Sequence, residues 1–146
     1  MTEPLVVRDL ILRDYKTIRF LLDELGYPTP EEEVKERLER INSDKTLKTL
    51  VAEIEGEIVG FIGLCKSYSY ERSGCYIRIT ALIVSEQYRE KGIGTRLLQA
   101  AEEWARLLNA SCIVLSSGLN RKEAHKFYEN KGFYIKGYSF FKDVVC

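Results

Sequence analysis

The sequence predicts a mixed α/β protein in which helices pack on a β-sheet. Two observations support this class. Apolar residues recur at helical spacing in four segments, and short apolar runs that are typical of strands alternate with them. In chain order these segments follow the pattern β-α-α-β-β-β-α-β-α-β-β, which favours one sheet with helices on it. At 146 residues, the chain is expected to form a single domain over residues 1–146.

The first segments predict a short strand followed by two helices. Residues 5–10 (LVVRDL) are a candidate strand. A helix is expected after Asp14, a candidate N-cap, and Gly26 can end that helix. A second helix is expected after a capping box formed by Thr29 and Glu32. Pro30 would then take the first helical position.

The pattern changes its period in the middle of the chain. Residues 50–65 predict two strands that are joined by a tight turn at Glu55-Gly56. A third strand is expected at residues 75–84, after a polar loop at residues 71–74.

The C-terminal half is expected to return to alternating helices and strands. A long amphipathic helix is expected from Thr95 to Leu108, and a short buried strand over residues 112–117. A helix over residues 120–131 would be capped by Asn120 and stopped by Gly132. Residues 133–137 (FYIKG) and 138–145 (YSFFKDVV) predict closing strands, joined by a hairpin.

Composition limits the possible partners. Twenty-two basic and 22 acidic residues give a formal net charge of zero, which lends no support to binding of nucleic acid or a membrane surface. No apolar run approaches the roughly 20 residues of a membrane span, and no signal peptide is visible. The four cysteines match no metal-binding pattern, so no metal is expected. We interpret them as free thiols of a cytoplasmic protein.

The segment YREKGIGTRLL, residues 88–98, places two glycines where a helix must start. The first amides of a helix have no internal acceptor, so a glycine-containing turn before a helix can bind an anion such as phosphate. Arg89 and Lys91 add positive charge there. The same spacing also fits a simple turn that needs a positive φ. The mononucleotide loop GxxxxGK[ST] and the dinucleotide fingerprint GxGxxG are both absent.

The segment closely resembles the GNAT superfamily of acyl-CoA-dependent N-acetyltransferases. Arg89, Gly92 and Gly94 match the family signature [R/Q]-x-x-G-x-[G/A] after a strand. Residues 123–133 (EAHKFYENKGF) are similar to a second family block, A-x-x-F-Y-x-x-x-G-F. The resemblance covers nearly the whole chain, and it implies a mostly antiparallel, splayed sheet flanked by helices, with acetyl-CoA as cosubstrate.

The resemblance also implies roles for particular residues. The backbone of the central strand at Leu82–Val84 would bind the pantetheine arm, and the following amides would hold the pyrophosphate. The implied coenzyme-binding residues are Leu82, Ile83, Val84, Arg89, Glu90, Lys91, Gly92, Ile93, Gly94, Thr95, Asn120 and Arg121. Many family members have an asparagine where this chain has Arg121, so Asn120 can instead be a simple helix cap.

Tyr128 is the expected catalytic acid, since the tyrosine of family members at this position points at the coenzyme sulfur. An ordinary phenol is a suitable proton donor to a departing thiolate. Periodicity alone would equally make Tyr128 part of the apolar stripe of its helix. The general base stays open between water and a carboxylate such as Glu24 or Glu71. The acceptor is expected between the first two helices and the following strands, with Tyr27, Tyr68, Tyr70 and Arg78 as lining candidates.

The sequence therefore predicts an N-acetyltransferase that transfers an acetyl group from acetyl-CoA to a primary amine by direct attack. The amine can belong to a small molecule or to a protein. The alternative is a non-catalytic module that binds coenzyme A in a regulatory role. A homodimer is possible through the aromatic residues 138–145. The identity of the amine, and whether the acyl group is strictly acetyl, are not specified by the sequence.

Overall fold

The computed structural model describes residues 4–145, which form two compact units. The first unit extends through Val114 and the second begins at Leu115. Each unit is described by itself below.

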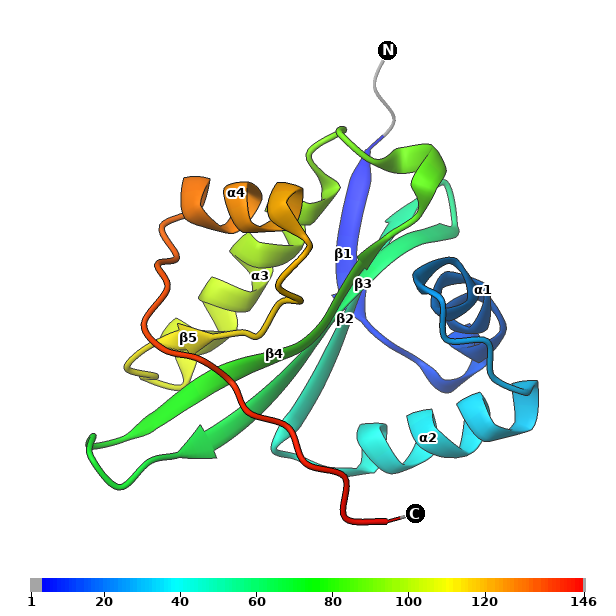
Figure 1. Cartoon of the computed structure of the whole chain (residues 1–146). Coiled ribbons are helices and arrows are strands. Elements are labelled where there is room, and N and C mark those ends of the chain that lie inside the picture. The colour runs from blue at the N-terminus through cyan, green and yellow to red at the C-terminus, as the bar shows by residue number, and fades with distance from the viewer. Residues whose placement is uncertain (1–3, 146) are drawn as a thin grey trace. The chain divides into compact units, whose positions relative to one another are not determined.

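The first unit contains a five-stranded sheet with the strand order β1-β2-β3-β4-β5 (Figure 1). The strands are β1 (Leu5–Asp9), β2 (Leu47–Ile54), β3 (Glu57–Tyr68), β4 (Cys75–Val84) and β5 (Ile113–Val114). Neighbours from β1 to β4 pair antiparallel, and β5 pairs with β4 in parallel. The first four strands confirm the expected positions, whereas β5 is shorter than the expected strand over residues 112–117.

Helices cover both faces of this sheet (Figure 1). Helices α1 (Tyr15–Leu25) and α2 (Glu31–Ser43) lie on one face, and α3 (Ile93–Leu107) lies on the other. Two short 3-10 helices, η1 (Leu12–Asp14) and η2 (Glu86–Tyr88), precede α1 and α3. We call the two faces of the sheet the α1/α2 face and the α3 face.

Each face buries its own apolar stripe. On the α1/α2 face, Ile18 of α1 and Val34 of α2 are each 1% exposed and pack in one cluster with Val51, Phe61 and Ile83 of the strands. On the α3 face the helix contributes buried residues at helical spacing: Leu97, Leu98, Ala101 and Ala105. Because neighbouring strand residues point to opposite faces, these contacts establish which face each strand residue occupies.

Local chemistry explains several element boundaries. The turn between β2 and β3 is the expected one, since Glu55 and Gly56 both have positive φ (50° and 80°), as a tight hairpin turn requires. Gly26 ends α1 in the left-handed conformation, as expected. Asp14 precedes α1 but accepts its hydrogen bond from the amide of Ile11 at 2.9 Å, so it stabilises the preceding turn.

Three expected helix starts are wrong by one or two residues. Helix α2 begins at Glu31 after Pro30, and the Thr29 hydroxyl donates to the Tyr27 carbonyl instead of forming a capping box. Helix α3 begins at Ile93 instead of Thr95. The N-cap of α4 (Lys122–Asn130) is Arg121 instead of Asn120, and no side chain caps it. Such differences of one or two residues are usual at helix ends.

The second unit contains α4 and an extended chain without regular structure from residue 133 to 145. Gly132 has a φ of 94° and follows the helix as expected. The two predicted closing strands and their hairpin are wrong for the described residues. Their aromatic side chains are exposed, among them Phe140 at 95% and Phe141 at 90%. Aromatic composition favours a strand only where a neighbouring strand supplies backbone partners, and none is formed here.

Candidate active site

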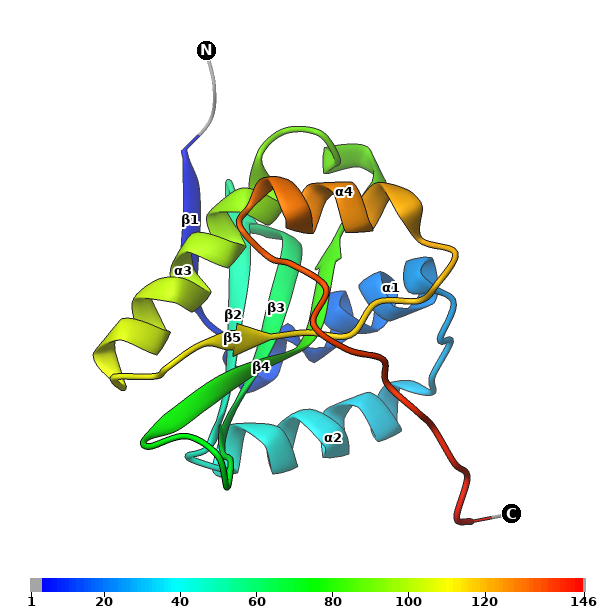
Figure 2. The same ribbon diagram turned by 60° about the vertical axis from the view of Figure 1, so that its left-hand side comes forward.

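Strand β4 has one edge that is paired over only part of its length. It pairs with β3 from Cys75 to Val84, but with β5 only at Ile77 and Arg78 (Figure 2). Among the described residues, no strand therefore pairs with this edge from Ile79 to Val84. Unpaired backbone donors and acceptors on a strand edge can bind an extended ligand. Leu82–Val84, expected to contact the pantetheine arm, lie within this open edge.

A β-bulge lies where the open edge begins. Gly63 pairs with Ala81 and Leu64 pairs with Ile79, so Thr80 is an extra residue in β4. A Cβ on Gly63 would lie 2.7 Å from the Thr80 hydroxyl, and a Cβ on Gly60 would lie 2.8 Å from the Ile83 carbonyl oxygen. The two glycines of β3 thus allow the close approach of β4. The bulge was not predicted from the sequence, although glycines inside a strand are a known signal for it.

The segment after β4 forms the start of helix α3. Glu90 and Gly92 have positive φ (63° and 80°), and Gly92 is the N-cap of α3. A Cβ on Gly92 would meet no atom within 4 Å, so this position needs glycine for its backbone conformation and leaves open space above it. The first helical hydrogen bond runs from the Arg96 amide to the Gly92 carbonyl.

The first turn of α3 can therefore bind an anion. The amides of Ile93, Gly94 and Thr95 come before Arg96, the first amide that donates within the helix, so they have no acceptor inside it and lie at its positive end. Arg89 is exposed, with its Nε 3.4 Å from the Val84 carbonyl oxygen. The Lys91 ammonium lies 5.4 Å from the centre of the Tyr88 ring. This turn is where the resemblance to the family would place the diphosphate of the coenzyme.

Glu24 of α1 holds the strand end that leads into this turn. Its carboxylate accepts the amide of Glu86 at 3.2 Å and the hydroxyl of Ser85 at 3.5 Å. Glu24 is one of the carboxylates expected as a possible base. Its hydrogen bonds connect α1 with the segment that leads into α3. Glu71, the other carboxylate considered, is exposed in the loop between β3 and β4.

In the second unit, Tyr128 lies on α4 among aromatic residues. Its ring is half-buried and contacts Phe127 and Phe133 edge-on, with ring centres 5.5 and 5.8 Å apart. Burial raises the pKa of Tyr128 above the ordinary 10.0, and the nearby Arg121 partly opposes this. The phenol is therefore protonated at neutral pH.

The residues just before α4 form a turn that leads into the helix. Asn120 and Arg121 are both exposed, and the Arg121 amide donates to the Gly118 carbonyl. The Nε2 of His125 donates to the same carbonyl at 2.8 Å. This hydrogen bond gives His125, the only histidine of the chain, a role in holding the turn.

The expected acceptor residues of the first unit do not lie together. Tyr27 is exposed just after α1, and Tyr70 is exposed in the loop after β3. Tyr68 pairs with Cys75, which bonds to the end of α3, so Tyr68 is on the α3 face. Arg78 pairs with Cys65 of β3. Cys65 is two residues from a position on the α1/α2 face, so Cys65 and its partner Arg78 lie on that face too. The sheet thus separates Tyr68 from Arg78.

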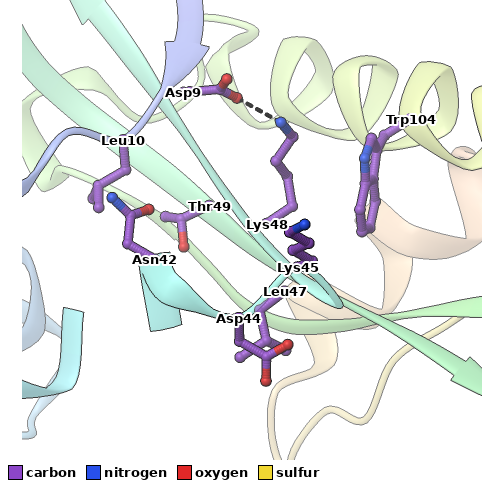
Figure 3. A pocket seen from close by; sticks show the side chains of 9 residues that line it. All are labelled: Asp9, Leu10, Asn42, Asp44, Lys45, Leu47, Lys48, Thr49 and Trp104. Atoms are coloured by element: carbon purple, nitrogen blue, oxygen red, sulfur yellow. Dashed lines mark ion pairs between the residues drawn. The ribbon is translucent and has the colours of Figure 1, made fainter. Parts of the chain in front are cut away.

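A hollow of about 400 Å³ lies elsewhere, at the end of β2 that extends beyond β1 (Figure 3). Lys48 reaches across it to Asp9 at 2.9 Å, and Trp104 of α3 forms another wall. None of the expected site residues lines it. This hollow therefore lies apart from the strand edge and the helix start described above.

The comparison with protein families agrees with this geometry. A sequence profile of the acetyltransferase (GNAT) family matches residues 10–133, so the chain belongs to this family. The match includes the strand edge, the glycine turn and Tyr128.

Individual proteins support the same conclusion. An uncharacterized N-acetyltransferase of Bacillus subtilis is 44% identical over 72 residues, 49% of this chain and 51% of the relative. The aminoalkylphosphonate N-acetyltransferase of Salmonella typhimurium is 34% identical over 87 residues, 60% of this chain and 56% of the relative. The matches thus span about half the length of these curated relatives.

A solved structure extends the similarity to the whole fold. The GNAT family acetyltransferase of Staphylococcus aureus has a TM-score of 0.80 and 31% identity, covering 99% of this chain and 100% of that chain. The predicted fold class, a mostly antiparallel splayed sheet flanked by helices, is confirmed. Among residues 4–145, no helix is long and apolar enough to cross a membrane.

Proposed function

We propose that this acetyltransferase transfers an acetyl group from acetyl-CoA to a primary amine of a small molecule. The open edge of β4, which is followed by η2, the glycine turn and the first turn of α3, is the observation that carries this proposal. An extended thioester arm fits beside an unpaired strand edge, and a diphosphate fits the amides of a helix start. Residues 1–146 would act as one N-acetyltransferase domain.

The coenzyme contacts follow from these two features. The backbone at Leu82–Val84 would bind the pantetheine arm, and the amides from Arg89 to Thr95 would bind the diphosphate. These contacts would use the main chain, so we expect a change at Gly92 to affect coenzyme binding more than the loss of a single side chain. Asn120 and Arg121 would add polar contacts, with Arg121 directed at a phosphate.

The chemistry requires a neutral amine and a proton donor. The amine nitrogen attacks the thioester carbonyl carbon, the C–S bond breaks, and the new amide loses a proton to water or a carboxylate. Tyr128 would donate its phenolic proton to the departing thiolate. The raised pKa of Tyr128 keeps that proton in place over the neutral pH range.

A Tyr128→Phe variant tests the acid role. We expect kcat to fall about 100-fold or more at neutral pH, a typical cost of losing a general acid, while acetyl-CoA affinity stays the same. The wild-type protein should lose activity on the alkaline side only above the raised pKa of Tyr128, and the variant should lack this limb. Tyr134→Phe, which changes an exposed tyrosine of the same unit, is the matched control.

The experiment measures free thiol released from acetyl-CoA across a panel of amines, alongside calorimetric binding of coenzyme A. Turnover of a small amine supports the proposal. Tight coenzyme binding without thiol release for any amine contradicts it and favours the regulatory alternative. Full turnover in Tyr128→Phe contradicts the role of Tyr128 as the acid but not the acetyltransferase activity.

A further inference from the structure

Arg78 occupies a central position on the α1/α2 face of the sheet. It lies in the middle of β4, directly opposite Cys65 of β3, and its side chain is exposed. It is two residues before Thr80, the extra residue of the bulge at which the open edge of β4 begins. At a rise of about 3.3 Å per residue, the strand carries Arg78 roughly 10 Å from Ala81.

The positions around Arg78 on this face are neutral. Along β4 its same-face neighbours are Tyr76 and Thr80, and across the strand pair they are Cys65 and Ser67. Three of these four side chains carry a hydroxyl group that can donate a hydrogen bond. The register therefore places one positive charge among neutral side chains of the neighbouring strands, including Val114 of β5.

The guanidinium of Arg78 has no polar partner. Within residues 4–145, no ion pair and no side-chain hydrogen bond joins Arg78 to another residue. The same is true of Arg13, Arg40, Arg72 and Arg121, but these four lie on helices or in loops, so Arg78 is the one such arginine on a strand of the described sheet. A guanidinium without a partner keeps its five donors available for a planar anion.

We infer that Arg78 binds an anionic group of the acceptor, so that the substrate is a small primary amine that also carries a carboxylate or a phosphonate. This inference rests on the proposed function. An arginine recognises both kinds of oxyanion through two parallel hydrogen bonds. With the thioester beside the open edge after Thr80 and the anion at Arg78, the amine and the acid group are separated by only a few bonds.

Matched amines that differ only in charge test the inference. β-Alanine and its amide have the same size, and 2-aminoethylphosphonate adds the phosphonate arm. We expect kcat/KM to be at least 10-fold higher for an anionic amine than for β-alanine amide. Arg78→Gln should lower kcat/KM for the anionic amine about 10- to 100-fold and leave the amide and the KM for acetyl-CoA unchanged. Arg78→Lys should restore part of the loss, because a lysine keeps the charge but not the planar pair of donors.

Lys66→Gln is the matched control. Lys66 follows Cys65 on β3 and points to the opposite face, so its loss removes a nearby positive charge without changing the α1/α2 face. The charge preference should survive in this variant. Equal losses in Lys66→Gln and Arg78→Gln would show a general effect of net charge and overturn the inference.

The result separates the inference from the proposed function. If β-alanine amide is turned over as fast as β-alanine and 2-aminoethylphosphonate, the role of Arg78 is overturned. The acetyltransferase activity is then still supported. If no amine is turned over, the proposed function fails, and binding still tests Arg78. The amide signals of Cys65 and Thr80 in NMR spectra should then shift with the anionic amines and not with β-alanine amide, and equal shifts would overturn the inference.

Discussion

At the residue scale, Asp14 is a buried carboxylate that joins two segments of the first unit. It is 7% exposed and accepts two hydrogen bonds from Arg8, at 2.9 and 3.1 Å, and one from the amide of Ile11. These bonds hold the pKa of Asp14 below its ordinary 3.8, although burial alone would raise it. The carboxylate connects β1 to the turn that starts α1.

We expect Asp14→Asn to lower the free energy of unfolding by about 2 kcal/mol at pH 7, because it removes the buried one of the two carboxylates that pair with Arg8. Since the folded pKa is depressed, the contribution of Asp14 is complete above the unfolded value near 4 and is lost as the pH falls through the folded value. Urea unfolding of both proteins from pH 7 to pH 2 measures this. The difference between them should shrink below pH 4, and a constant difference would contradict the assignment.

Asp9→Asn is the control for this experiment. Asp9 also forms an ion pair, with Lys48 at 2.9 Å, but it is 67% exposed. Exposed pairs contribute little, so the change should be below about 1 kcal/mol.

At the element scale, the two glycines of β3 determine how closely β4 approaches. A methyl group at position 60 would meet the backbone oxygen of Ile83, which cannot move without breaking the ladder. A methyl group at position 63 would meet the Thr80 hydroxyl, which belongs to a side chain. The two positions therefore differ in whether their crowding can be relieved.

We expect Gly60→Ala to destabilise the protein by about 1–3 kcal/mol, the usual cost of overpacking. Gly63→Ala should cost a similar amount in the wild-type background but little in a Thr80→Ala background, because the second change removes the crowding oxygen. A double-mutant cycle in urea measures the coupling. Additive effects of Gly63→Ala and Thr80→Ala would show that the two side chains do not meet.

The start of α3 depends on a different property of glycine. Gly92 has room for a side chain, but its φ of 80° lies in the left-handed region. We expect Gly92→Ala to cost about 1 kcal/mol of stability and to weaken coenzyme binding, because the helix start shifts to relieve the strain.

Gly132→Ala is the control. Gly132 also has a positive φ, 94°, and open space around it, but it follows α4 instead of preceding α3. Both variants should lose similar stability in thermal unfolding. Only Gly92→Ala should lose affinity for coenzyme A in calorimetry, and equal affinities would argue against a coenzyme site at α3.

At the scale of the whole molecule, the coenzyme is expected to stabilise the native protein by mass action. Coenzyme A at 100 times its dissociation constant should add about 2.7 kcal/mol to the free energy of unfolding. Thermal unfolding should show that coenzyme A raises the melting temperature. NAD should leave the melting temperature unchanged, because the dinucleotide fingerprint is absent. Stabilisation by NAD alone would point to a different nucleotide site.

Much of this molecule was predictable from short-range patterns. The positions of β1 to β4, the turn at Glu55-Gly56, the end of α1 at Gly26 and the glycine turn before α3 all follow from residues close together in the chain. Periodicity, positive φ and missing side chains act locally, so a short window contains the necessary information. The family resemblance rested on the same local segments.

Features that depend on distant partners were not predictable in this way. Residues 133–145 have the composition of strands, but a strand exists only if another strand accepts its hydrogen bonds. The bulge at Thr80 arises from the pairing of β3 with β4, and the register of that pairing puts Arg78 and Tyr68 on opposite faces. Backbone pairing across the chain decides these points, because a shift of one residue in register reverses the face of every side chain.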